Sequence, residues 1–300
     1  MISVIVNLYN MRREAARTLH SLSCKYQQGI TSEEYEVIVV ENGSSDPVGK
    51  FFVESHGRNF RYLDMGITAL PSPVCAVNLA INEAKGDFIG IVLDGARMAT
   101  PGLLAAARDG LRIAPRSVVG TIAWHLGDEH QSISSTKGYA QNVEDEILAS
   151  LDWQANGYRL FCRAAWAFSN PTGHFGFLAE SCATFLSREL YEAVGGYDSA
   201  FALPGGGYAN LDFFKRCCET EGVKFVLLIG EGTFHQYHGG ATTGLAAADY
   251  GSRAADEYRS IRGCGYQPPL LNPIFFGAIA PQVLPWLGKS IEKNCASNEE

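Results

Sequence analysis

Short, nearly continuous apolar runs separated by polar or glycine-rich turns recur along the first 120 residues. The runs at 2–8, 35–40 and 88–94 are typical of strands buried on both faces of a parallel sheet. Amphipathic stretches lie between them, and Ala15, Leu19 and Leu22 mark the first. Strands that alternate with helices at such close intervals predict an α/β fold with a Rossmann-like, mostly parallel sheet flanked by helices.

Polar residues follow each of these runs at its carboxyl end. The first run leads into Tyr9 and Asn10, the second into Glu41, and the third ends at Asp94. Ligands of open α/β sheets bind beyond the carboxyl ends of the strands, so we expect these residues to face one nucleotide-binding crevice. The alternatives are a packing aromatic for Tyr9, a solvated strand end for Glu41 and a helix-capping carboxylate for Asp94.

Several short segments occur in an order and spacing that is specific only as a set. They are residues 3–6 leading to Tyr9, 36–46, 78–80 with 84–87, 93–94, and 194–198. At these segments the sequence resembles the family 2 glycosyltransferases, which have the GT-A fold, and the resemblance covers roughly residues 1–245. It implies an enzyme that moves a sugar from a nucleoside diphosphate sugar to a hydroxyl acceptor, which would be a glycan, a polysaccharide or a small molecule.

The resemblance also implies site residues. Asn7, Tyr9 and Glu41 occupy positions that lie against the nucleoside in the family, and an aromatic ring and a carboxylate suit base stacking and N–H or hydroxyl recognition. Asp94 falls at the diphosphate and metal position. In several GT-A enzymes a histidine after the last strand completes the metal shell, which makes His235 and His238 candidate ligands for Mn²⁺ or Mg²⁺.

Two departures from the family pattern affect this expectation. Gly95 and Ala96 stand where relatives place a further aspartate, so the charge of Arg97 is an alternative to a metal for holding the diphosphate. Ala209 and Asn210 stand where relatives carry a Glu-Asp pair, whose aspartate is the general base of inverting members. A carboxamide cannot accept that proton.

The general base must then be another carboxylate. We expect Asp212 to serve ahead of Glu180, because both lie in or beside glycine-rich segments on the side predicted for the acceptor. The same departures leave open a second class of protein, a nucleotide-sugar-binding relative that has lost catalysis and acts in an assembly.

Other nucleotide-binding classes are disfavoured. No dinucleotide-binding glycine fingerprint follows the first apolar run, and no complete phosphate-loop sequence Gly-x-x-x-x-Gly-Lys-Ser/Thr occurs. A nucleotidyltransferase would carry a basic, glycine-rich loop after that run, and the sequence has none. The net charge of −8, without a Lys/Arg cluster, argues against a nucleic-acid partner.

The remaining composition bears on location and on the C-terminal segment. Eight cysteines without a Cys-x-x-Cys pair, and no leader before the first strand, predict reduced thiols and a cytoplasmic protein. We expect a domain over 1–245 and a helical, proline-interrupted extension over 246–300 that packs on the domain or a partner. Three prolines within 270–287 argue against a membrane span, leaving homo-oligomer or peripheral membrane contact as alternatives.

Overall fold

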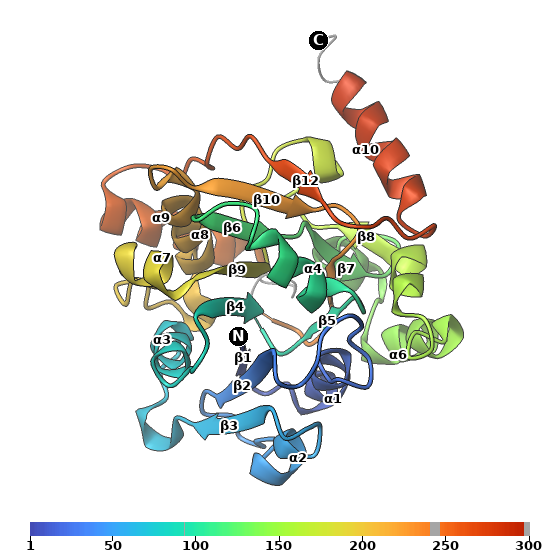
Figure 1. The fold of residues 1–300 in the computed structure, drawn as a ribbon. Helices are drawn as coiled ribbons and strands as arrows, with labels where there is room; N and C mark the ends of the chain where they lie inside the picture. The colour runs from blue at the N-terminus through green and yellow to red at the C-terminus, as the bar shows by residue number, and fades with distance from the viewer. Residues whose placement is uncertain (93, 241–246, 297–300) are drawn as a thin grey trace.

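The apolar runs form one large, mostly parallel sheet, as predicted. The computed structural model describes residues 1–92, 94–240 and 247–296. Eight strands lie side by side in the main sheet (Figure 1). In spatial order they are β12 (Ile274–Phe276), β10 (Lys224–Leu228), β6 (Ser117–Gly120), β9 (Ala183–Ser187), β4 (Phe88–Val92), β1 (Ile2–Leu8), β2 (Tyr35–Glu41) and β3 (Phe60–Asp64). Only β9 runs antiparallel to its two neighbours in this sheet.

Helices cover both faces of this sheet, which explains why its central strands are apolar throughout. Side chains alternate along β1, so that Ile5 joins one core cluster while Val4 and Val6 join the cluster on the opposite face. Helices α3 and α8 pack on the first face, and α1 and α4 on the second. The helices are α1 (Arg12–Ser21), α2 (Lys50–Glu54), α3 (Val74–Asn82), α4 (Leu103–Gly110), α5 (Gln131–Ser134), α6 (Gln141–Leu151), α7 (Arg188–Ala193), α8 (Ala209–Glu219), α9 (Ala247–Arg262) and α10 (Leu284–Ala296).

A second, four-stranded sheet was not expected from the sequence. It contains β5 (Arg97–Ala99), β11 (Thr233–His235), β7 (Ala123–Leu126) and β8 (Ala164–Trp166), in that spatial order. Its register sets Arg97 opposite His235 and His235 opposite His125. Three side chains from distant parts of the sequence therefore lie in one row across adjacent strands.

The C-terminal segment contributes to the body of the fold. Helix α9 contacts η5 (Pro204–Gly206), where the Tyr250 hydroxyl donates to the Pro204 carbonyl oxygen at 2.6 Å. Strand β12 extends the main sheet beside β10. Helix α10 extends outward (Figure 1) and is joined to the body, where Trp286 Nε1 donates to the Phe161 carbonyl oxygen at 2.8 Å. The boundary predicted near residue 245 falls outside the described residues. Within the described ranges, no helix has the length and apolar character needed to cross a bilayer.

Candidate active site

A cavity of about 640 Å³ opens beyond the carboxyl ends of β1 and β4. We expected Asp94 to be the last residue of this strand. Strand β4 instead ends at Val92, Leu93 lies outside the described residues, and Asp94 follows in the turn. Most of the predicted site residues line the cavity: Asn7, Tyr9, Asp94, Arg97, Glu180, His235 and His238. Glu41 and Asp212 do not contribute to the lining.

Asp94 and two histidines form a compact group of ligand atoms. The Nε2 atoms of His235 and His238 lie 3.2 Å apart, and His235 Nε2 lies 3.8 Å from Asp94 Oδ2. One donor atom from each of the three residues lies within 4.8 Å of the others. The structure thus brings together the three residues that the sequence analysis named as candidate metal ligands.

These donors fit a divalent cation. A six-coordinate ion with donors at about 2.1 Å holds neighbouring donors about 3 Å apart, close to the separation of the two imidazole nitrogens. Burial lowers the pKa of His235 well below its ordinary value, so the ring is neutral and offers a lone pair. Imidazole ligands favour Mn²⁺ over Mg²⁺, because Mg²⁺ is the harder of the two ions and binds mainly oxygen donors.

Steric packing explains the missing second aspartate. A Cβ atom at Gly95 would lie 1.8 Å from Leu8 Cδ2, well inside van der Waals contact. The backbone N–H of Ala96, the next position, donates to Asp94 Oδ1 at 3.0 Å and its side chain is buried. The turn after β4 therefore presents Asp94 alone, and histidines from β11 and its following loop complete the group.

Three buried side chains of the cavity lining have polar atoms without a hydrogen-bond partner among the described residues. These atoms are Asn7 Oδ1, Asn42 Oδ1 and Arg97 Nη1. Arg97 is 7% exposed, and its Nε lies 3.5 Å from Asp94 Oδ2. Buried polar atoms are rarely left unpaired, so their position in the lining indicates a polar ligand with donors for the amide oxygens and an anionic group for Arg97.

Glu180 also lies in this cavity, on the segment between β8 and β9. Its Oε2 accepts a hydrogen bond from Asn210 Nδ2 at 2.5 Å, and Asn210 Oδ1 accepts from the Tyr197 hydroxyl at 2.8 Å. Burial raises the pKa of Glu180, and the Asn210 hydrogen bond and the charge of Arg97 partly oppose that rise. A positioned carboxylate with a raised pKa can act as a general base near neutral pH.

The structure does not support the predicted role of Asp212 as the preferred base. Asp212 is 2% exposed, and its carboxylate accepts hydrogen bonds from Arg262 at 2.7 and 2.8 Å and from Arg216 at 2.8 Å. Burial alone would raise its pKa, but the two guanidinium groups hold the pKa below its ordinary value. Asp212 therefore fastens α9 to α8, and we assign it a structural role.

Glu41 does not reach the nucleoside side of the cavity either. It is 1% exposed, and its carboxylate accepts from the hydroxyl of Ser44 and from the backbone N–H of Val48 at 3.1 Å. The same loop donates from the Ser45 backbone N–H to Asn10 Oδ1 at 2.9 Å. Glu41 thus shapes the loop that positions Asn10 at the cavity, in place of the direct contact predicted.

Several residues of this cavity were missed at the sequence level. His125 and His130 line it with their ring centroids 4.1 Å apart, and Phe168 stacks on His130 at 3.7 Å. Tyr250 of α9 also lines it. His125 and His235 each come directly after a short apolar segment of the sequence. This shared pattern was the available signal for His125.

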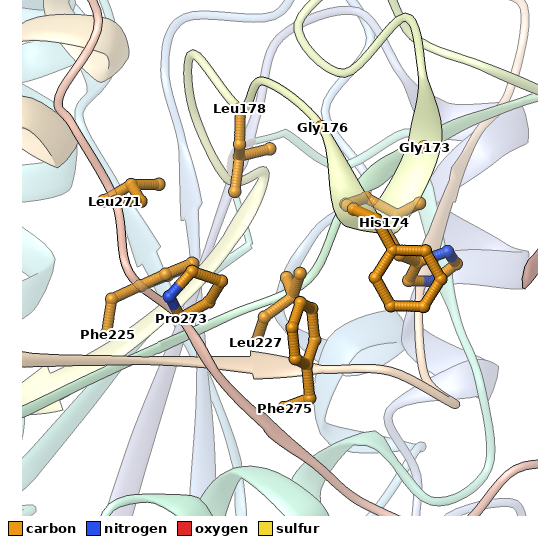
Figure 2. Close-up of a pocket in the computed structure, with 11 residues that line it drawn as sticks. Gly173, His174, Gly176, Leu178, Phe225, Leu227, Leu271, Pro273 and Phe275 are labelled. Carbon is orange, nitrogen blue, oxygen red and sulfur yellow. The ribbon is translucent and has the colours of Figure 1, made fainter. Parts of the chain in front are cut away.

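A second cavity, of about 320 Å³, lies between η4 (Gly173–Phe175), β10 and the segment that leads into β12 (Figure 2). Its lining is apolar except for the buried imidazole of His174. None of the predicted site residues belongs to the described lining. Of these two cavities, the first is the one whose described lining offers a positive charge, Arg97, to a nucleotide.

Comparisons with known proteins agree with the geometry. Residues 3–165, more than half of the chain, match glycosyl transferase family 2. No curated protein matches the sequence. Three solved structures share the GT-A fold, at a sequence identity that supports likeness of fold alone. The mannosyltransferase PcManGT from Pyrobaculum calidifontis, in complex with GDP-Man and Mn²⁺, has a TM-score of 0.54 and 16% identity, and the match covers 96% of this chain and 68% of that one. S. aureus TarS has a TM-score of 0.52 and 15% identity (86% of this chain, 39% of that one), and S. aureus TarS 1-349 in complex with UDP-GlcNAc has a TM-score of 0.51 and 15% identity (86% of this chain, 66% of that one).

The chain thus spans about two fifths of the TarS chain and about two thirds of the other two. The family match includes β1, β2, β4 and the turn that carries Asp94. The fold, the position of the cavity and the matched residues lead to one conclusion: the chain belongs to glycosyl transferase family 2.

Proposed function

We propose that the chain transfers a glycosyl group from a nucleoside diphosphate sugar to a hydroxyl acceptor. The observation that carries this proposal is that one cavity contains both Glu180 and the group of Asp94, His235 and His238. The first can hold the leaving diphosphate through a cation, and the second can take a proton from the acceptor. Such a transfer needs both functions near each other.

The donor nucleoside would lie at the β1 end of the cavity. Tyr9 is 54% exposed at this edge, so its ring face is free to stack on a base. The unpaired Oδ1 of Asn7 offers an acceptor for a base or ribose group. The structures bound to UDP-GlcNAc and to GDP-Man support a nucleotide sugar in general without selecting the base.

Asp94, His235 and His238 would hold the divalent cation, which would neutralise the charge that develops on the departing diphosphate. Arg97, buried behind Asp94, contributes fixed positive charge at the same place. The Mn²⁺ recorded in the PcManGT complex supports the choice of Mn²⁺. The alternative, in which Arg97 alone holds the diphosphate, predicts activity in EDTA.

Glu180 would accept the proton of the acceptor hydroxyl as that oxygen attacks the anomeric carbon. Asn210 fixes its carboxylate in the cavity through the 2.5 Å hydrogen bond. A base on the acceptor side supports an inverting reaction. The stacked pair of His130 and the exposed Phe168 offers an apolar ring surface for the acceptor.

A panel of UDP- and GDP-linked sugars, incubated with the protein and Mn²⁺, tests the proposal through slow donor hydrolysis. We expect one donor to release its nucleoside diphosphate at a rate that EDTA abolishes. A relative that only binds nucleotide sugars, the alternative raised by Asn210 at the usual base position, would bind a donor without turnover. No binding and no turnover with any donor would contradict both.

A further inference from the structure

The side chain of Gln131 lies between two histidines of the cavity and is fully buried. Its Oε1 lies 2.7 Å from Nδ1 of His235 and 3.2 Å from Nδ1 of His125. The two imidazoles come from neighbouring strands, β11 and β7, and both face the same amide oxygen. One side chain therefore contacts the two histidines at the same ring atom.

The surroundings of Gln131 fix which end of its amide faces the rings. Its Nε2 lies 2.9 Å from the His235 carbonyl oxygen, and 3.4 Å from both the Leu126 carbonyl oxygen and Glu144 Oε2. All three neighbours are acceptors. Turning the amide over would set its oxygen against these acceptors, so the N–H₂ group must face them and Oε1 must face the imidazoles.

This orientation determines the tautomer of the histidines. A carbonyl oxygen accepts hydrogen bonds and cannot donate them, so Nδ1 of each neutral ring must carry the proton. The lone pair of His235 is then on Nε2, the atom that lies toward His238 Nε2 at 3.2 Å and Asp94 Oδ2 at 3.8 Å. A hydrogen bond at the other nitrogen commonly orients a metal-binding histidine in this way.

Glu144 holds the same segment from the other side. It is fully buried, and its Oε2 accepts from the Tyr237 backbone N–H at 2.7 Å and from the Tyr139 hydroxyl at 3.2 Å. Gln131 and Glu144 therefore fasten the backbone of His235 and Tyr237, directly before His238.

We propose that Gln131 is a positioning residue, which fixes the Nδ1–H tautomer of His235 and His125 and so turns the His235 Nε2 lone pair toward Asp94. The inference rests on the proposed function for the use of that lone pair in metal binding. The tautomer itself follows from the hydrogen bonds alone. The two parts can therefore fail separately.

The test uses ¹⁵N-histidine-labelled, metal-free protein and long-range ¹H–¹⁵N correlation spectra, which identify the protonated ring nitrogen. Wild type should show Nδ1–H for His235, and Gln131→Met, which keeps the length and removes the amide, should show a mixture of tautomers. Gln27→Met is the matched control, because Gln27 is also buried but bonds the backbone of Ser21, Thr100 and Leu104 away from the cavity. It should leave the tautomer unchanged.

Binding of Mn²⁺ in the presence of UDP or GDP, followed by electron paramagnetic resonance, supplies the second readout. We expect Gln131→Met to weaken it by about 10- to 100-fold, and Gln27→Met to leave it unchanged. A wild-type His235 protonated at Nε2, or an unchanged tautomer in Gln131→Met, would overturn the inference without any use of metal. Wild type with the expected tautomer but no Mn²⁺ binding would contradict the proposed metal role and leave the positioning role standing.

Discussion

The amide of Asn210 donates from Nδ2 to Glu180 Oε2 over 2.5 Å. The residue at the usual position of the general base thus becomes the hydrogen-bond partner of a carboxylate from another segment. Its own oxygen is held by the Tyr197 hydroxyl, which fixes the amide orientation. The arrangement keeps one carboxylate in the cavity although the sequence lacks the expected Glu-Asp pair.

Replacing Glu180 with Gln keeps the side-chain shape and removes the proton acceptor. We expect the kcat for transfer to fall by about 10²- to 10⁴-fold, while donor affinity changes less than about twofold. Steady-state kinetics and calorimetric donor binding check the two quantities. Transfer at the wild-type rate would rule out Glu180 as the base.

Replacing Asp212 with Asn should lower stability and leave chemistry intact. The change removes the negative partner of Arg216 and Arg262, and because both arginines are partly exposed we expect a loss of about 2–3 kcal/mol in the free energy of unfolding. Urea unfolding measures this loss, and the kcat of the folded fraction should stay within about twofold of wild type. A large fall in kcat with unchanged stability would return Asp212 to the catalytic machinery.

Tyr9→Ala should weaken nucleoside diphosphate binding by about 3- to 10-fold, because a stacking ring contributes about 0.5–1.5 kcal/mol. Tyr9→Phe keeps the ring and should bind like wild type. Calorimetric titration compares the two variants. Equal weakening in both would show that the hydroxyl and not the ring makes the contact.

Glu231 predicts a pH dependence of stability that is separate from the active site. It is 4% exposed, accepts hydrogen bonds from the Thr100 and Tyr158 hydroxyls, and has its pKa raised by burial to about 7. Between the ordinary pKa near 4.5 and this value, the folded state binds more protons than the unfolded state. Stability is therefore lost as the pH rises through this window.

Glu231→Gln should remove that loss. The free energy of unfolding of the variant minus that of wild type should therefore be about 2–3 kcal/mol larger at pH 8 than at pH 4. Urea unfolding at both pH values measures the difference. Glu144 has a pKa raised to about 7 in the same way, and comparing wild type with the variant cancels its contribution. An equal stability difference at both pH values would contradict the assignment.

The sequence predicted the main sheet well because its strands are buried on both faces and therefore read as continuous apolar runs. Strands β1 and β2 match the predicted runs closely. The second sheet escaped prediction because its strands are three or four residues long and pair residues such as Arg97 and His235 that lie far apart in the chain. The spacing of apolar residues within a short stretch of sequence does not show which distant strands pair.

The site was predicted in part, and the misses have a common cause. Asp94 follows β4 and His235 is the last residue of β11, so their position could be inferred from the rule for strand ends. Asp212 and Glu41 were acidic residues in suitable segments, but Asp212 is bound by Arg262 of the distant helix α9, and Glu41 is bound by the loop that folds back after its own strand. The acidic run at 144–146 has a pattern typical of a solvated helix start, yet Glu144 is fully buried, because Arg13 and the backbone N–H of Tyr237 pair with its carboxylate.

The most direct test of the account is calorimetric titration of UDP and GDP into the protein, with Mn²⁺ or with EDTA. We predict that one nucleotide binds at least about tenfold more tightly with Mn²⁺, and that Asp94→Ala removes this gain. Asp87→Ala, an exposed carboxylate just before the start of β4, should keep it. Affinity that is unchanged by EDTA and by Asp94→Ala, yet collapses in Arg97→Ala, would contradict the metal centre at the heart of this account.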